Sequence, residues 1–494
     1  MKPSKDEDEF SSYRPLFNTS LLSKSIEKAG LLQLSEYLEN FHSIPEIQSA
    51  YKRHHSVETA LCKIYNDLII KKSTGGCTML VMLDLSAAFD CIDQETLLQD
   101  MELLGIRGTA LDWFRSYLTG RHFRVEVENT LSTTAEMNTG ICQGTILAPI
   151  LFSIYTIELY HIISNMGIQC HFYADDTQIL IDVESEDQAN LDFEIMFEVV
   201  TNWMSRRKLK LNAEKTECMI LGNRYKLDQL ASFNSIELND SSTLSLVKKV
   251  KNLGVLFEQD LSMESQLKSV KGKAIGNLVN IARISKYIDR ESKLKLVYGL
   301  VFSQVDFCNS LYAGLPNYRL RPLQMIINSS ARLIVGLPRF SRERITPICI
   351  DLHFLPVKAR IMFKICLLVY KTLHYEQPLY LRRLLQHSIP ARPLRSGQSE
   401  RLSEPIVAQS AYSDRCFTFC APRMYNSLPD EVRHSTSLEM FKRRLKTFIF
   451  RQAYDLETIR INEQFDVELK LLYCILVYCF CILYLYIVFV FIFR

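Results

Sequence analysis

The chain has 494 residues, of which 48% are hydrophobic, so it is long enough for two or three domains with large cores. Its formal net charge of +3 is too small to indicate a partner by itself. The 14 cysteines include no CxxC pair and no Cys/His set at zinc spacing, and the charged start MKPSKDEDEF is not a secretory signal peptide. These features favour an intracellular protein with reduced cysteines.

The first predicted elements are a buried strand and two helices. The continuous apolar run TMLVMLDL at 78–85 ends in an acid and is typical of a buried strand. Helical spacing follows over 87–105, which ends on Gly105, a residue suited to a helix C-terminus. A second amphipathic helix is predicted at 111–120, and the alternation of RHFRVEVE predicts a half-exposed strand at 121–128.

The next segment predicts a loop, a helix and a hairpin. Glycines and Gln143 indicate an irregular loop, and Pro149 suits the first turn of the helix after it. In QCHFYADDTQIL, strand-forming residues flank a tight turn at Ala174-Asp175-Asp176. The remaining expected elements are a helix at 191–208, a strand–turn–strand at 209–222, and a strand and turn at 250–260. Together they predict an α+β core with antiparallel hairpins over 76–257, not a purely parallel sheet.

Two adjacent carboxylates, Asp175 and Asp176, have two interpretations. Aspartate is common in surface turns, because its side chain bonds to its own backbone. A hard cation such as Mg²⁺ also prefers carboxylate oxygens, but such a site needs a further ligand. Asp84, at the end of the buried strand, is the candidate, because a lone buried charge there would be costly. The three acids converge if their strands are neighbours in one sheet.

Beyond about residue 262 the chain becomes mainly helical and basic. Such charges often form a solvated helix face, and their density beside a candidate metal site equally favours a phosphate-binding helical domain. The basic residues of this stretch are Lys268, Lys271, Lys273, Arg283, Lys286, Arg290, Lys293 and Lys295.

The C-terminal part has a predicted connector, a helix and an apolar tail. Pro, Arg and Ser are frequent at 388–405, and the helix at 437–450 places Leu438, Phe441, Leu445 and Phe448 on one face. The uncharged run at 471–493 is long enough to span a bilayer. Translation of non-coding sequence is the alternative, because the run lacks the small residues that pack spanning helices.

Five motifs in order carry a family resemblance: LDLSAAFD, GICQGTILAPILF, FYADD, LNAEKTE and LGVLFEQD. The chain resembles reverse transcriptases of non-LTR, LINE-like retrotransposons of the jockey and CR1 type. YRPLFNTSLLSKSIEK and QSAYKRHHSVETAL resemble the fingers motifs of that family, and residues 355–450 resemble its C-terminal region.

The resemblance implies a right-hand polymerase fold. Residues 13–257 would form fingers and a palm with an antiparallel sheet, and 258–375 a helical, basic thumb. Residues 376–456 would be a mostly helical C-terminal region of unassigned role, followed by the tail at 457–494 with its apolar run. The family usually carries an endonuclease before the polymerase, and the expectation is that this chain lacks it.

The implied activity is RNA-directed DNA polymerisation with two Mg²⁺ ions, or Mn²⁺ in their place. Asp84, Asp175 and Asp176 resemble the metal ligands, and the carbonyl of Leu85 would face the second ion. Lys215 resembles the lysine that protonates the leaving pyrophosphate, although a lone lysine in a turn is more often only solvated.

Further residues resemble nucleotide and primer contacts. Phe89 matches the steric gate against a ribose 2′-OH, with a core phenylalanine as the alternative, and Gln143-Gly144 match the motif beside nucleotide and template, with an ordinary loop as the alternative. Where the family usually has arginine to clamp the triphosphate, this chain has Lys52, with Arg53 beside it. The residues that match the primer grip are Leu253, Gly254 and Val255.

The partners implied are an RNA template, a DNA primer and dNTPs, and no protein partner is indicated. Nuclear and cytoplasmic locations both fit, with membrane anchoring only if the run at 471–493 is a true span. The competing hypothesis is an inactive retrotransposon remnant that at most binds nucleic acid.

Overall fold

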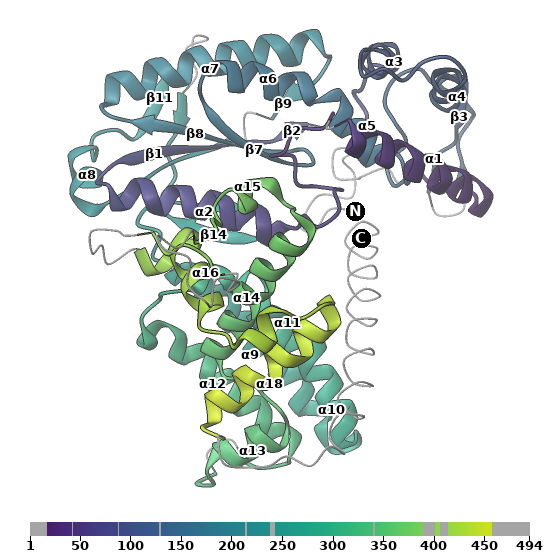
Figure 1. Ribbon diagram of the computed structural model, residues 1–494. Helices are drawn as coiled ribbons and strands as arrows, with labels where there is room; N and C mark the ends of the chain where they lie inside the picture. The colour runs from purple at the N-terminus through teal and green to yellow at the C-terminus, as the bar shows by residue number, and fades with distance from the viewer. Residues whose placement is uncertain are drawn as a thin grey trace.

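A central antiparallel sheet organises the first half of the computed structural model, which describes residues 17–41, 43–86, 88–127, 130–212, 215–237, 243–338, 341–388, 401–405 and 413–456. Figure 1 shows this sheet with helices on both faces and a largely helical half below it. The strand order is β10-β1-β8-β7, and every neighbouring pair is antiparallel. Its strands are β1 (Cys77–Leu83), β7 (Gln169–Tyr173), β8 (Asp176–Val183) and β10 (Glu217–Gly222). The predicted α+β class with antiparallel sheets is therefore confirmed.

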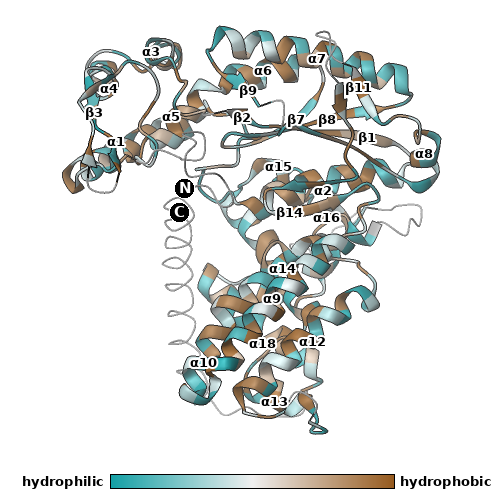
Figure 2. Cartoon of the chain, turned by 180° about the vertical axis from the view of Figure 1, so that it is seen from behind, coloured by the Kyte–Doolittle hydropathy of each residue, from teal (hydrophilic) through white to brown (hydrophobic). Residues whose placement is uncertain are grey.

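The sheet is buried because helices cover it on both sides. One face carries α6 (Ile157–Asn165) and α7 (Glu186–Arg206), and the other carries α2 (Val57–Ser73) (Figure 1). β1 is apolar and almost entirely buried, and in β8 the residues from Thr177 to Ile181 are buried, as expected for strands covered on both faces. The covering helices carry hydrophilic and hydrophobic residues along their length (Figure 2), which is the pattern of a helix with one buried face.

A second group of helices lies to one side of the sheet. It contains α1 (Leu21–Asn40), α3 (Gln94–Leu103), α4 (Thr109–Leu118) and α5 (Ala148–Tyr155). Short two-stranded ladders accompany them: β3 (Arg121–Phe123) with β6 (Ala135–Met137), and β4 (Glu126–Val127) with β5 (Thr130–Leu131). Pro149 lies in the first turn of α5, as predicted.

Two boundaries predicted from the sequence are wrong. The helix expected over 87–105 begins only at Gln94, because the Asp93 side chain accepts a hydrogen bond from the Thr96 N–H and caps the helix there. The strand expected over 121–128 is divided, because Phe123 pairs with Ala135 whereas Glu126 pairs with Leu131. The predicted buried face of this strand is also wrong, because Val125 and Val127 are more than half exposed.

Short elements complete the sheet-bearing half. Small ladders pair β2 with β9, β11 with β12 and β13 with β14. These elements are β2 (Leu85–Ser86), β9 (Lys210–Leu211), α8 (Arg224–Gln229), β11 (Ser235–Glu237), β12 (Thr243–Ser245), β13 (Lys249–Asn252) and β14 (Val255–Glu258).

The second half of the chain is helical, as predicted. It opens with the long helix α9 (Glu264–Ile284), which packs against α12 (Asn317–Ile334). The other elements are η2 (Ser285–Tyr287), α10 (Arg290–Leu296), η3 (Val297–Phe302), α11 (Ser303–Asp306), η4 (Asn309–Tyr312), α13 (Ile345–Asp351), α14 (Val357–Tyr375), α15 (Leu379–Arg382), η5 (Ser413–Arg415), α16 (Phe417–Asn426), α17 (Asp430–Arg433) and α18 (Leu438–Tyr454).

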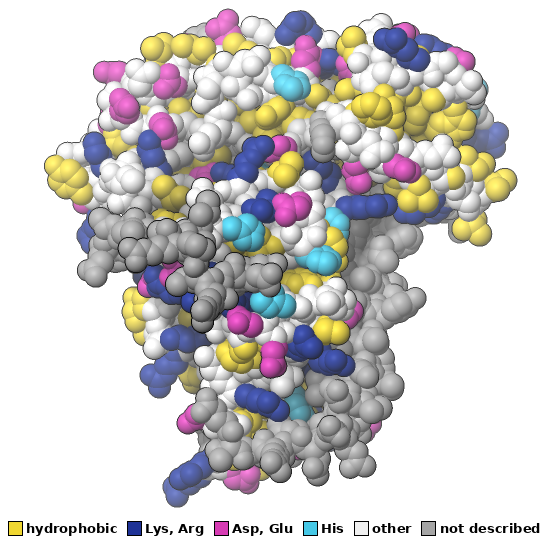
Figure 3. Space-filling model, in the orientation of Figure 1, with side chains coloured by type: hydrophobic (Ala, Val, Ile, Leu, Met, Phe, Trp, Pro, Cys, Tyr) yellow, Lys and Arg dark blue, Asp and Glu magenta, His cyan; other side chains and the backbone are white. Residues whose placement is uncertain are grey.

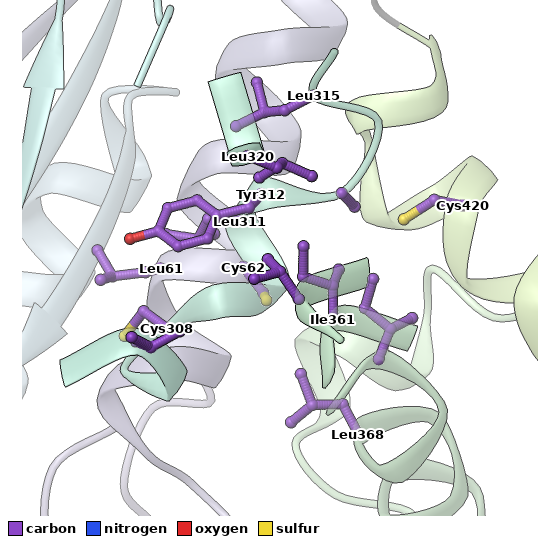
Figure 4. Close-up of a cluster of buried hydrophobic side chains, with 14 of the residues drawn as sticks. Leu61, Cys62, Cys308, Leu311, Tyr312, Leu315, Leu320, Ile361, Leu368 and Cys420 are labelled. Carbon is purple, nitrogen blue, oxygen red and sulfur yellow. The ribbon is translucent and has the colours of Figure 1, made fainter. Parts of the chain in front are cut away.

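Two clusters of buried side chains form the cores. One lies between the sheet, α6, α7 and the helices at its side. The other begins at α2 and continues through α9, α12 and α14 to α18, so the described parts of residues 376–456 share a core with the helices before them. Figure 4 shows this second cluster where Leu61 and Cys62 of α2 lie near Cys308, Ile361 and Cys420. The predicted apolar face of α18 is part of it through Phe441 and Leu445.

Two expectations concern features at the limits of the described residues. None of the helices that the structure describes is long and apolar enough to cross a membrane. The apolar run at 471–493 lies outside the described residues, as does most of the predicted connector at 388–405. Within the described ranges the cysteines form no disulfide.

Candidate active site

The sheet register brings Asp84 next to the Asp-Asp hairpin. Leu83 of β1 pairs with Thr177 of β8, and continuing this antiparallel register by one residue sets Asp84 opposite Asp176. Side chains directly opposite each other in such a pair have Cβ atoms about 4.5–5.5 Å apart. Asp176 also pairs with Tyr173, which leaves Ala174 and Asp175 as the two-residue turn. Asp84 and the distant pair Asp175 and Asp176 therefore meet at one end of the sheet.

The pKa of Asp176 reflects the negative charge gathered at this site. Its pKa is raised from 3.8 to about 6, first by burial and then by the charges of Asp175 and Asp84, while Lys215 acts in the opposite direction. The two neighbouring carboxylates are thus close enough to disfavour a third negative charge. A concentration of carboxylates of this kind is the chemistry that hard divalent cations bind.

Asp84 is held by its backbone and paired through its side chain. The N–H of Asn212 donates to the Asp84 carbonyl over 2.8 Å, next to the short β2–β9 ladder in which Leu85 pairs with Leu211. The Lys215 ammonium lies 3.2 Å from the Asp84 carboxylate. The turn after β9 therefore delivers the predicted lysine to the first predicted aspartate, and both side chains keep contact with solvent.

The carboxylates do not form a finished ligand set. Within the described ranges, no group of three or more His, Cys, Asp or Glu side chains is arranged to hold a metal ion. The physical reason lies in the charges: like carboxylates repel each other, and Asp84 is turned to the Lys215 ammonium. The residues present fit a divalent ion in chemistry and in proximity, and binding would require their side chains to rearrange.

The two basic residues predicted to clamp a triphosphate lie in the loop before α2. Lys52 donates to the Pro45 carbonyl over 3.2 Å, and burial lowers its pKa, while Glu46 and Glu39 act to raise it. Arg53 is exposed. The charges that shift the pKa of Lys52 are thus those of Glu46 and Glu39, and the three aspartates are not among them.

Phe89, Gln143 and Gly144 lie around one loop. The Phe89 ring packs against Phe152 with centroids 5.0 Å apart, and its carbonyl accepts from the Ile141 N–H over 2.9 Å. Gly144 has a left-handed φ of +91°, and the buried side-chain oxygen of Gln143 has no partner among the described residues. A core contact of Phe89 is therefore present, and it does not exclude a second role.

The predicted primer-grip residues form a tight hairpin. Asn252 pairs with Val255, so Leu253 and Gly254 are the two turn residues, with φ of 45° and +89°. Two positive φ values are typical of the turn that matches the twist of a hairpin. Val255 is buried, whereas Leu253 packs partly buried against the helical core.

Two polar residues of this region escaped prediction from the sequence. Glu27 of α1 is 1% exposed, and its carboxylate accepts from the Ile146 N–H over 2.6 Å, which ties the loop around Gln143 to α1. Gln178 is fully buried on β8, two residues after Asp176, and no partner for its amide is present among the described residues. The sequence marks Gln178 as unusual, because it is a polar residue within a predicted strand. The sequence gives no such sign for Glu27, because its partner Ile146 is distant in the chain.

Comparison with known proteins identifies the family of the first half of the chain. Residues 2–257 match the family described as reverse transcriptase (RNA-dependent DNA polymerase). The probable RNA-directed DNA polymerase from transposon BS of Drosophila melanogaster is 25% identical over 422 residues, covering 82% of this chain and 45% of that protein. The RNA-directed DNA polymerase from mobile element jockey of Drosophila funebris is 22% identical, covering 70% of this chain and 38% of that protein. The chain thus spans less than half the length of these relatives.

A solved structure of apo telomerase from Candida tropicalis is similar over 73% of this chain and 61% of its own. Its identity is 12% and its TM-score 0.39, so the family assignment rests on the sequence match alone.

Proposed function

The chain belongs to the reverse transcriptase family, and on this premise we propose that it is an RNA-directed DNA polymerase that adds dNTPs to a primer 3′-OH on an RNA template. The observation that carries the proposal is the meeting of Asp84, Asp175 and Asp176 at one end of the sheet. Family members typically use divalent metal ions, and this is where the chain concentrates negative charge.

The proposed layout is that of a right hand. Residues 13–257 would be fingers and palm, and 258–375 a thumb that holds the template–primer duplex through phosphates. In support, seven lysines and arginines of the basic stretch are exposed on or next to α9 and α10: Lys268, Lys271, Lys273, Arg283, Lys286, Arg290 and Lys295. On the face shown in Figure 3, basic and acidic side chains are interspersed and do not form one large basic surface. The proposed phosphate contacts therefore rely on the basic residues along α9 and α10.

The three aspartates would hold two Mg²⁺ ions, or Mn²⁺ in their place, with the carbonyl of Leu85 facing the second. When bound, such ions stabilise the attacking and leaving oxygens of an in-line phosphoryl transfer. The raised pKa of Asp176 supports this assignment, because a site that disfavours a further negative charge favours a positive one.

Lys215 would serve the leaving group. In the described state it neutralises Asp84, and the exposure of its side chain leaves it free to turn to a triphosphate. There it would stabilise the pyrophosphate and donate a proton to it.

The remaining roles concern the substrates. Phe89, which follows Asp84 in the same motif, would exclude a ribose 2′-OH while its ring stays packed on Phe152. Gln143 and Gly144 would line the nucleotide, and Lys52 or Arg53 would approach its phosphates. The turn at Leu253 and Gly254, with Val255 behind it, would support the primer end.

Primer extension by the full chain tests the proposal. Wild-type protein should extend an oligo(dT) primer on poly(A), and the double variant Asp175→Ala with Asp176→Ala should lose that activity while still binding RNA. Asp182→Asn is the matched control, because Asp182 lies on the same strand, is exposed and pairs with Lys71 away from the site.

Two outcomes would overturn the assignment. Extension that survives in the double variant would remove the three aspartates from the chemistry. Salt-dependent RNA binding without extension by the wild type would support an inactive remnant that only binds nucleic acid.

A further inference from the structure

A short segment joins the sheet-bearing half to the helical half. This junction segment, residues 259–263, lies between β14 and α9 and is largely buried. Leu261 and Met263 have left-handed φ values of 52° and 61°. The Met263 side chain makes no cap for α9, and the Glu258 carboxylate accepts from the Ser265 N–H in its place. Because left-handed conformations are unfavourable for such residues, surrounding contacts must hold the segment in place.

Three cations from three different regions hold it. Lys72 at the end of α2 donates to the carbonyl of Asp260, Arg415 of η5 donates to that of Leu261, and Arg319 of α12 donates to that of Ser262. Three consecutive carbonyls thus each receive a charged donor. We call Lys72, Arg319 and Arg415 the three-cation clamp.

The clamp lies beside a cavity of about 680 Å³, which all three side chains line together with Asp260 and Ser262. The charges are close enough to influence each other: burial lowers the pKa of Lys72 to about 8, with Arg415 and Arg319 adding to that effect and Asp260 opposing it. Holding these like charges together has an electrostatic cost, which the bonds to the junction carbonyls offset.

Arg415 brings the C-terminal region into this junction. It is 8% exposed, and it also donates to the Tyr65 hydroxyl of α2. One guanidinium thus joins α2 to the junction segment. Next to it, the Asp414 carbonyl lies so close to Gly314 that a Cβ there would come within 2.5 Å of it. The C-terminal region is thus seated against the helical half at the point where that half begins.

The clamp is remote from the proposed chemistry. Gly222 donates its N–H to the carbonyl of Gln259 in the junction segment, and it pairs with Cys77 at the start of β1. Asp84 follows the opposite end of β1. Seven residues of strand separate these ends by about 23 Å, at about 3.3 Å per residue. An effect of Arg415 on polymerisation must therefore act through the position of the helices.

We propose that Arg415 is a positioning residue: through the three-cation clamp it fixes the helical half against the sheet-bearing half, and thereby sets the grip on the template–primer duplex. Only the statement about the grip on the template–primer duplex rests on the proposed polymerase function. The first part concerns the fold and is open to measurement without nucleic acid.

The first experiment measures hydrogen exchange in the free, full-length protein. Arg415→Gln should speed exchange in residues 259–267 roughly tenfold, which corresponds to about 1.4 kcal/mol, because the junction segment loses a hydrogen bond from a charged donor. Arg319→Gln should act in the same direction, and Arg415→Lys should restore part of the protection. Arg451→Gln, an exposed arginine of α18, is the control and should change nothing there. Unchanged exchange in both clamp variants would overturn the inference.

The second experiment separates grip from chemistry. In Arg415→Gln, the Kd for the template–primer duplex should rise and products should shorten, while the rate of nucleotide incorporation in the bound complex stays unchanged. A slower incorporation rate at unchanged Kd would contradict a positioning role. If the wild type extends no primer but the exchange result holds, the proposed function fails and the clamp stands.

Discussion

His171 is a residue whose role only its neighbours define. It is 2% exposed on β7, and its ring nitrogen lies 2.9 Å from the Ser49 hydroxyl, which in turn lies 2.9 Å from the hydroxyl of Tyr380. Tyr380 also donates to Thr59 of α2 over 2.9 Å. This chain of contacts joins the sheet to α2 and to the C-terminal region.

The burial of His171 predicts a loss of stability in acid. Burial lowers its pKa to about 3, with Lys63 and His55 adding to the effect, whereas an unfolded histidine titrates near 6.5. Below pH 6.5 the unfolded state therefore binds a proton that the folded state does not, so stability falls as the pH drops. From about pH 7.5 to about pH 5.5 this one group should cost about 1.4 kcal/mol.

Urea unfolding at the two pH values would measure this effect. His171→Gln should lose less stability on acidification than the wild type, by about 1.4 kcal/mol. Because His55, whose pKa is also lowered by burial, to about 4, is present in both proteins, its contribution cancels. His122→Gln, at an exposed position, should follow the wild type, and the same slope in all three proteins would rule out the buried histidine as the cause.

At the scale of elements, the β13–β14 hairpin depends on backbone conformation more than on side chains. Gly254 occupies a left-handed position and its Cβ site lies 3.4 Å from the Phe307 ring. Gly272 lies in the interior of α9, where a Cβ would meet nothing within 4 Å. The same substitution should therefore have opposite consequences at the two glycines.

Gly254→Ala should destabilise the protein by about 1–2 kcal/mol, the cost of a left-handed residue with a side chain. Gly272→Ala should stabilise it by up to about 1 kcal/mol, because alanine restricts the unfolded chain and favours a helix. Chemical denaturation of both variants measures these values. Equal effects of the same sign would show that the turn conformation does not matter for stability.

At the scale of the whole molecule, the C-terminal region is part of a shared core. Phe441 of α18 is fully buried and stacks on Tyr370 of α14 with centroids 4.0 Å apart, in the cluster that reaches back to α2. Other links run from Thr418 to Asn66 and from Arg383 to Glu46. Residues 376–456, whose role the sequence left open, thus brace the helices that would form the thumb.

Phe441→Ala should cost about 3–5 kcal/mol and should weaken α2 and α12 as well as α18, because they belong to one cluster. Hydrogen exchange along the chain would detect this. Phe193→Ala, an equally buried phenylalanine of the other cluster, is the comparison and should affect α6 and α7 first. Faster exchange confined to α18 in Phe441→Ala would contradict a shared core.

The sequence by itself determined the α+β class, the strand that ends at Asp84, the hairpin at Asp175 and Asp176, and the family. These features depend on hydrophobic period and on motifs of a few adjacent residues, which local physics and resemblance make readable. The start of α3 at Gln94 was missed because a single capping bond decided it.

Only the tertiary structure decided which distant groups meet. The contact of Lys215 with Asp84, the bond of Glu27 to the loop at Ile146 and the bonds of Lys72, Arg319 and Arg415 to the junction segment join residues that are between 57 and 188 positions apart in the chain. No periodicity encodes such a pair, because each partner satisfies its local pattern equally well without the other. Burial and the demand of backbone carbonyls for donors select these contacts, and they act only once the chain has folded.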